Sequence, residues 1–227
     1  MRHHPCPSCG ADVPFRTSIS VYAVCASCGS MVVRTDDAVA SIGTMAALPE
    51  EASALQLGTG LHWADHAYTI IGRVRMSWGD GGWNEWFLDG DGGQAWLAEA
   101  QGTLAISFGH PVPAALAQDI PALNQAVRID GRDYRVADIK QATCVGSEGE
   151  LPFAAPRGRT AATVDLLSAS SGFAGLEVGD GERRFYLGSY TGFEALRFSN
   201  LREIEGWGRP PERTAMRALD PASTLPI

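Results

Sequence analysis

Four cysteines lie in two closely spaced pairs near the start of the chain: Cys6 with Cys9, and Cys25 with Cys28. Two residues separate the members of each pair, so one tight turn can direct both sulfurs at the same metal ion. The fifteen residues between the pairs are enough for a hairpin that returns the second pair to the first. We therefore predict one structural zinc ion in a zinc ribbon, with Cys6, Cys9, Cys25 and Cys28 as its ligands.

A disulfide and a redox-active dithiol are the alternative uses of these cysteines. A disulfide needs an oxidising compartment, and no apolar export segment precedes Cys6. No stretch of the chain reaches the ~20 apolar residues that span a bilayer. We therefore expect a cytoplasmic protein without membrane insertion. Four thiolates complete a tetrahedral zinc shell, so the metal is expected to have no catalytic role.

Trp83, Glu85 and Trp86 form a second group, which Glu148 would join if the two halves of the chain face each other. One interpretation is a groove for a peptide strand or a small ligand, with Glu85 as its polar anchor. The alternative, which we favour, places the rings in the core, because a small barrel needs large side chains to fill it. In a strand, Trp83, Glu85 and Phe87 share one face and Trp86 takes the other.

Three further groups have weaker patterns. His62 and His66 have no identifiable third partner for metal binding or acid–base chemistry. The segment 89–93 resembles the start of a calcium loop, but its twelfth position is Ala100 rather than Glu, so a hairpin turn is the better interpretation. Cys144 is expected to be a buried thiol.

A carboxylate cluster is a further hypothesis, in which Glu148, Glu150 and Asp165 approach Glu85 from the second half of the chain. The alternative is that these acids lie on a solvated strand face. Only the three-dimensional arrangement of the two halves can decide between these alternatives.

The elements that position these residues are predicted to be mainly β. Short apolar runs alternate with turns rich in Gly and Asp, which is typical of an antiparallel β barrel or sandwich. We divide the chain into a zinc ribbon (1–35), a connector (36–55), a β-rich domain (56–207) and a flexible tail (208–227). The Ala-rich composition of the connector favours one short helix across Ala38 to Leu48, and its length permits some independence of the two modules.

The β-rich domain contains a faint internal echo. A pattern of strand, Gly-rich turn and acidic strand between Leu57 and Leu97 recurs in 127–136, 148–153 and 184–188. This echo predicts two similar half-units related by a pseudo-twofold axis, with an insertion in the second.

Several motifs in this region are similar to those of the bacterial family called domain of unknown function 4178: Gly72–Arg75, Gly82–Trp86, Gly92–Gly102 and Phe185–Gly188. The resemblance covers about residues 55–207. It implies a β-rich domain, often preceded by a zinc ribbon, without an established activity. It also implies a bacterial origin and an association with membrane-stress or polyamine-related systems. It supplies no catalytic residues.

Composition limits the classes of partner. With 45% apolar and 19% charged residues, the chain has the make-up of an ordinary globular protein. Its net charge of −8 speaks against broad nucleic-acid binding, because phosphate contacts need concentrated Lys and Arg.

Two functions fit these features. The first is a non-catalytic zinc-ribbon adaptor or scaffold that mediates protein–protein interaction. The second is a ligand-binding or hydrolytic β domain, recruited by the ribbon, with its site between the half-units near Glu85. Neither the identity of a partner nor the oligomeric state can be derived from the sequence.

Overall fold

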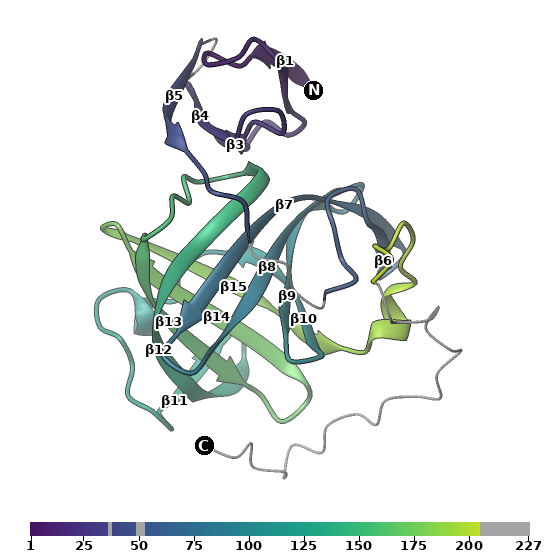
Figure 1. Ribbon diagram of the computed structural model, residues 1–227. Helices are drawn as coiled ribbons and strands as arrows, with labels where there is room; N and C mark the ends of the chain where they lie inside the picture. The colour runs from purple at the N-terminus through teal and green to yellow at the C-terminus, as the bar shows by residue number, and fades with distance from the viewer. Residues whose placement is uncertain (36–37, 49–52, 205–227) are drawn as a thin grey trace.

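The structure is a computed structural model of the chain and describes residues 1–35, 38–48 and 53–204 (Figure 1). Every pairing among the described strands is antiparallel. Two parts are distinguished below: the cysteine module, residues 1–35 and 38–48, and the barrel, which begins at Leu55. No helix among the described residues is both long enough and apolar enough to cross a membrane.

The cysteine module contains β1 (Arg2–Pro5), β2 (Asp12–Phe15), β3 (Tyr22–Val24), β4 (Ser30–Thr35) and β5 (Ala38–Thr44). β1 pairs with β2, and β3, β4 and β5 form a separate meander. Figure 1 shows this module at one end of the barrel.

The prediction of a helix across Ala38 to Leu48 is wrong. Residues Ala38–Thr44 form strand β5, which pairs with β4 from Thr35 to Ser30. Alanine has the highest helix propensity, but propensity is a weak determinant, and the hydrogen bonds offered by the open side of β4 outweigh it. The expected tail, residues 208–227, lies outside the described residues.

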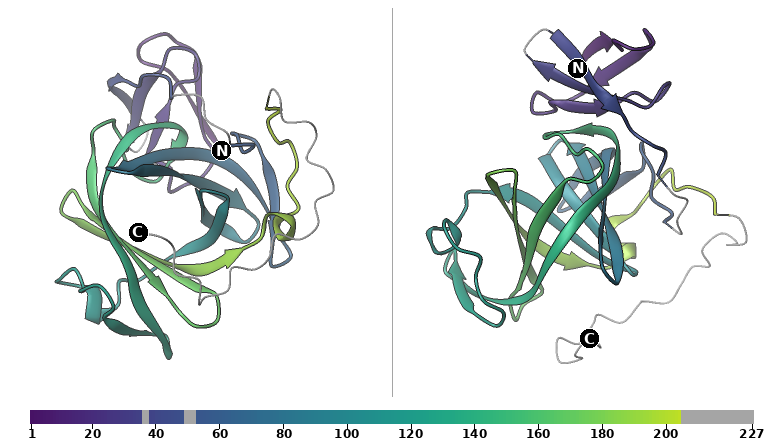
Figure 2. Two further views of the ribbon diagram at one scale, coloured as in Figure 1. Left: turned by 60° about the horizontal axis from the view of Figure 1, so that its bottom comes forward. Right: turned by 60° about the vertical axis from the view of Figure 1, so that its left-hand side comes forward.

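The remaining elements belong to the barrel. They are β6 (Gly60–Trp63), β7 (His66–Trp78), β8 (Gly81–Gly90), β9 (Gly93–Ala100), β10 (Thr103–His110), η1 (Ala114–Leu116), β11 (Ala126–Ile129), β12 (Arg132–Leu151), β13 (Thr160–Leu167), β14 (Gly172–Gly179), β15 (Glu182–Thr191) and η2 (Phe193–Leu196). The strands run in the order β12-β13-β14-β15-β10-β9-β8-β7, and β7 also pairs with β12. This last pairing closes the sheet into a barrel, whose strands curve around a common axis in Figure 2.

The barrel consists of two halves with the same order of elements. A short strand, a meander and a 3-10 turn follow one another in β6 to η1 and again in β11 to η2. Corresponding hairpins even share their register, since Leu61 faces Tyr68 in the first half and Val127 faces Tyr134 in the second. The two half-units that the echo predicted are therefore present. The segment 148–153 is not a separate repeat element, however, because β12 runs through to Leu151.

Each half has its own apolar core on the outer face of its meander. The short strand folds back over this face, and the 3-10 turn of the other half completes it, with Leu196 in the first core and Leu116 in the second. A third apolar cluster lies between the halves, inside the barrel, and includes Phe87, Trp96 and Cys144. Side chains of β7, β8 and β9 from the first half thus meet side chains of β12 and β15 from the second half inside the barrel.

Candidate functional site

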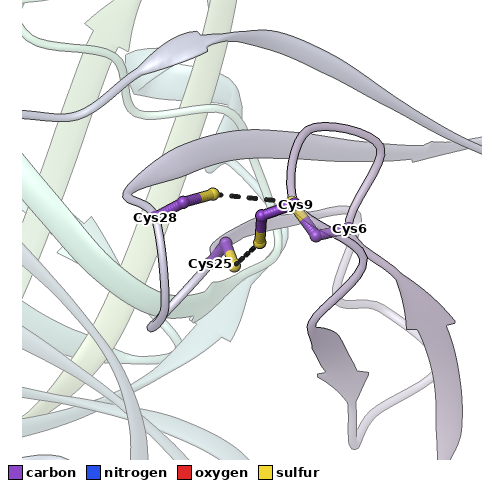
Figure 3. Close-up of side chains that lie close together, drawn as sticks. All are labelled: Cys6, Cys9, Cys25 and Cys28. Carbon is purple, nitrogen blue, oxygen red and sulfur yellow. Dashed lines mark hydrogen bonds between the residues drawn. The ribbon is translucent and has the colours of Figure 1, made fainter.

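The four N-terminal cysteines converge on one point between the β1–β2 and β3–β4 hairpins (Figure 3). Their Sγ atoms all lie within 4.8 Å of one another. Cys6 Sγ is 3.7 Å from Cys28 Sγ, and Cys9 Sγ is 3.8 Å from Cys25 Sγ. Within the described part of the chain, this is the one group of three or more Cys, His, Asp or Glu side chains close enough to hold a metal ion.

Two similar turns bring the sulfurs together. In the first, the Gly10 N–H donates to the Cys6 carbonyl at 2.9 Å, and in the second the Gly29 N–H donates to the Cys25 carbonyl at 2.9 Å. Gly10 has φ +76° and Gly29 has φ +71°. Glycine adopts this left-handed conformation without strain, which explains why a glycine directly follows each second cysteine.

The sulfur positions fit a tetrahedral metal ion. A metal–sulfur distance of about 2.3 Å gives a tetrahedron whose edges are about 3.8 Å long. The two shortest sulfur–sulfur separations, 3.7 and 3.8 Å, match that edge, and all five cysteines of the described chain are free of disulfides. The donor set can therefore hold one metal ion and leaves it no open coordination position.

Local hydrogen bonds favour the thiolate form of two of these cysteines. Ser30 Oγ lies 3.2 Å from Cys28 Sγ, and hydrogen bonding to Ser30 lowers the pKa of Cys28 to about 6. A backbone hydrogen bond at Ser8 lowers the pKa of Cys6. Because the thiolate is the metal-binding form of cysteine, these contacts favour a cation at Cys6 and Cys28. A backbone hydrogen bond at Ala11 lowers the pKa of Cys9, but the Cys28 side chain, burial and the other two thiols together raise it to about 11.

The cysteine module is fixed to the barrel by strand pairing. Tyr22 and Ala23 of β3 pair with Leu151 and Glu150 at the end of β12, so the sheet of the module continues into the barrel. The Glu150 side chain is buried, accepts the Arg16 backbone N–H at 2.5 Å and forms an ion pair with the Arg16 guanidinium. The two modules are therefore joined by a continuous sheet and by an ion pair, which limits the independence that the length of the connector permits.

Trp83, Glu85, Trp86 and Glu148 do not form one groove. Trp83 and Glu85 point into the barrel, whereas Trp86 has no exposed surface and lies in the outer core of the first half. The strand alternation predicted for β8 is therefore confirmed, and for Trp86 the core interpretation holds.

Trp86 and Glu148 take part in a different network, centred on Arg73. The Arg73 guanidinium lies over the Trp86 ring at 4.7 Å, and it donates to Glu148 at 3.2 Å and to Asn84 at 2.9 Å. Trp86 Nε1 donates to Glu99 at 3.0 Å. These polar contacts hold β7, β8, β9 and β12 in register next to the closure of the barrel, which is a structural role.

Glu85 lies on the inner face of β8 and is partly exposed. Its carboxylate accepts the Trp83 Nε1–H at 2.9 Å. Burial, with Glu177 and then Asp165 adding negative charge, raises the pKa of Glu85 to about 7 although the Trp83 hydrogen bond opposes this. Burial likewise raises the pKa of Asp165 to about 6. Carboxyl groups tuned in this way can exchange protons near neutral pH.

Of the three acids that the sequence placed near Glu85, one acts on it. Asp165 of the second half adds negative charge that helps to raise the pKa of Glu85 in the first half. Glu148 and Glu150 face away, because Arg73 and Arg16 hold them.

Sequence reasoning missed the third acid of this interior, Glu177. Glu177 lies on β14 directly opposite Arg184 of β15. Ala174 and Leu176 are buried in the outer core, so alternation alone places Glu177 on the inner face. The alternation of apolar and polar residues along this strand could have identified Glu177 from the sequence.

The remaining sequence candidates have structural roles. His66 Nδ1 is 3.2 Å from Asp91 at the β8–β9 turn, which confirms the hairpin interpretation of segment 89–93. His62 pairs with Ala67 rather than with His66. Cys144 lies in the interior apolar cluster, and burial raises its pKa to about 11, so it is an inert thiol.

A family model described as "Domain of unknown function (DUF4178)" matches residues 56–192, which includes all strands from β6 to β15. No curated protein and no solved structure matches the chain.

Proposed function

We propose that this chain, which belongs to the DUF4178 family over more than half of its length, is a non-catalytic adaptor built around a structural zinc ion. The cysteine module supplies the recruiting surface and the barrel supplies a rigid support. We place the partner's docking site on strand β5, where an extended segment of a partner protein adds one further strand.

Zinc is the proposed metal because the donor set consists of four thiolates in tetrahedral arrangement with no open position. Iron is the other metal that four thiolates bind in this geometry. Metal analysis of freshly purified protein separates the two, since the zinc form is colourless and contains about one zinc per chain. An iron content that exceeds the zinc content would refute the assignment.

The observation that carries the adaptor proposal is the free edge of β5. Among the described strands, β5 pairs with β4 alone and ends the sheet. Its sequence, Ala38–Thr44, contains no charged residue and no proline, which are the groups that usually protect an exposed edge. The Ile42 side chain is 49% exposed and has no paired residue on β4 because the register shifts there.

A lysine on this edge tests the proposal. The tagged full chain and its Ile42→Lys variant are expressed at native level, and co-purified proteins are compared by mass spectrometry. We expect a partner that wild type retains and Ile42→Lys loses, because a charge on an edge strand blocks strand addition. Ile120→Lys is the matched control, since Ile120 is 44% exposed and lies in the loop after η1.

Point variants are a sharper test than deletion of the cysteine module. Tyr22 of β3 lies in the interior apolar cluster of the barrel and its hydroxyl is 3.1 Å from Ser147 Oγ. A deletion would therefore open the barrel core and create artificial contacts. Partners retained equally by wild type and by Ile42→Lys would contradict docking on β5.

The second candidate function is binding of a small ligand inside the barrel, with or without hydrolysis. It is favoured by one observation: Glu85 and Asp165 come from different halves, have raised pKa values and keep some solvent exposure. A ligand screen by thermal shift tests it, with Glu85→Gln abolishing any stabilisation and the exposed Asp133→Asn leaving it unchanged.

A further inference from the structure

A pocket of about 600 Å³ lies where the cysteine module meets the barrel. Val21 precedes β3 and contributes from the module, and Phe153 contributes from the loop between β12 and β13. Arg159 and Arg184 supply positive charge. Neither Glu85 nor a residue of β5 lines the pocket, and neither proposed function uses it.

Arg159 has an unsatisfied donor at this pocket. Its side chain is 3% exposed, Nε donates to Asp180 at 2.5 Å and Nη2 donates to Glu177 at 2.6 Å. Nη1 is buried and has no hydrogen-bond partner among the described residues. A buried guanidinium N–H without an acceptor is unfavourable, so Arg159 Nη1 can donate a hydrogen bond to one further acceptor.

Arg184 adds a second guanidinium beside the first. Its Nη1 donates at 2.9 Å to Glu177 Oε1, the same oxygen that Arg159 contacts. Both guanidinium groups lie over the Phe153 ring, Arg159 at 5.2 Å and Arg184 at 4.3 Å. The two guanidinium groups thus share one buried carboxylate, Glu177, and each has one further acidic partner, Asp180 for Arg159 and Glu182 for Arg184.

The other two carboxylates at the pocket are exchangeable. Asp180 pairs with Arg159, and Glu182 pairs with Arg184, but their side chains are 57% and 62% exposed. Because both carboxylates reach solvent, they can turn away from the arginines and an incoming anion can take their place as the partner of Arg159 and Arg184. Both residues flank the β14–β15 turn and have room to rotate towards solvent.

From these contacts we propose that the pocket binds the oxyanion group, carboxylate or phosphate, of a small organic molecule. The oxyanion accepts hydrogen bonds from Arg159 Nη1 and from Arg184, as guanidinium groups do with both kinds of anion. The organic part packs against Phe153 and the two prolines that line the pocket, Pro152 and Pro156. Since Val21 forms one wall, the ligand bridges the cysteine module and the barrel.

Isothermal titration calorimetry of the full, metal-loaded chain tests this site. The probes are phenyl phosphate, benzoate and the neutral analogue benzamide. We expect one or both anions to bind and benzamide not to bind, and the tighter anion identifies which oxyanion the pocket prefers. No binding of either anion at millimolar concentration would overturn the proposal.

Variants locate the binding. Arg184→Gln should weaken binding about tenfold, the effect of losing one hydrogen bond to a charged group. Arg157→Gln, an exposed arginine in the same loop as Phe153, removes the same charge and should change nothing.

The double variant Asp180→Asn with Glu182→Gln should strengthen ligand binding, whereas Arg184→Gln should weaken it. It removes the carboxylates that compete with the ligand, so we expect at least threefold tighter binding. This second test remains valid even if the Arg184→Gln variant does not fold. Unchanged or weaker binding in the double variant would refute the displacement of these acids.

Discussion

Two opposing effects act on the ionisation of the Glu85 carboxyl group. The Trp83 Nε1–H donates to the carboxylate at 2.9 Å and favours its ionised form. Burial and the neighbouring acids Glu177 and Asp165 oppose ionisation more strongly, so the pKa of Glu85 rises to about 7. At neutral pH this side chain is therefore close to half protonated.

The raised pKa of Glu85 makes the stability of the folded protein depend on pH. The folded-state pKa of about 7 lies above the ordinary value of 4.5, so the folded protein binds the proton more tightly than the unfolded chain. Stability should fall as pH rises from about 4.5 through 7. Glu85→Gln removes this loss and keeps an acceptor for Trp83. We expect Glu85→Gln to be more stable than wild type at pH 8, by on the order of 1 to 2 kcal/mol, and nearly equal to it at pH 5.

Urea denaturation at both pH values measures the difference. Asp133→Asn is the control, because Asp133 is an exposed partner of Arg128 and has no such conflict. A Glu85→Gln variant that is less stable than wild type at pH 8 would show that the ionised carboxylate is favourable in the barrel.

At the scale of elements, closure of the barrel depends on the approach of β7 to β12. Gly72 of β7 faces Gly149 of β12, and a Cβ built on Gly72 would lie 1.9 Å from the Glu150 carbonyl oxygen. No side chain fits between these two backbones. Gly72 also begins one of the motifs on which the family resemblance rests, and the close approach gives a physical reason for glycine at that position.

Gly72→Ala should therefore lower the free energy of unfolding by about 3 kcal/mol, because the backbones of β7 and β12 would have to separate. The same substitution at Gly109 in β10 is the control, since a Cβ there meets nothing within 4 Å. Chemical denaturation compares the two variants. If both substitutions changed the free energy of unfolding equally, the separation of β7 and β12 would cost no free energy.

At the scale of the whole molecule, the cysteine module and the barrel share one core. Tyr22 packs with Phe153 and Leu151 inside the barrel, and the Arg16–Glu150 ion pair lies beside them. Loss of the metal is expected to disorder the hairpins that carry the cysteines, and with them β3. The barrel then loses the cover over one end of its interior.

Chelation should therefore lower the melting temperature of the whole chain in a single transition. Differential scanning calorimetry with and without a strong chelator measures this effect, and re-addition of zinc should reverse it. Two separate transitions, with the upper one unchanged by the chelator, would show instead that the module and the barrel unfold independently.

Local spacing was sufficient to predict several features. The intervals between the cysteines, the glycine after each second cysteine and the alternation in β8 depend on residues that are near neighbours in the chain. Turn and strand geometry relate such neighbours directly, so the sulfur cluster and the opposite orientations of Glu85 and Trp86 followed from sequence. The same reasoning indicated the antiparallel β class and the two half-units.

Tertiary structure alone decided which distant residues meet. Glu148, Glu150 and Asp165 look alike in sequence, yet Arg73 and Arg16 hold the first two outside the interior. β5 became a strand because β4 offered an open edge, and composition could not reveal that edge. Val21 of the cysteine module reaches the pocket at Arg159 because β3 pairs with the end of β12. Register and closure are set by packing between distant segments, and local propensity carries no information about those contacts.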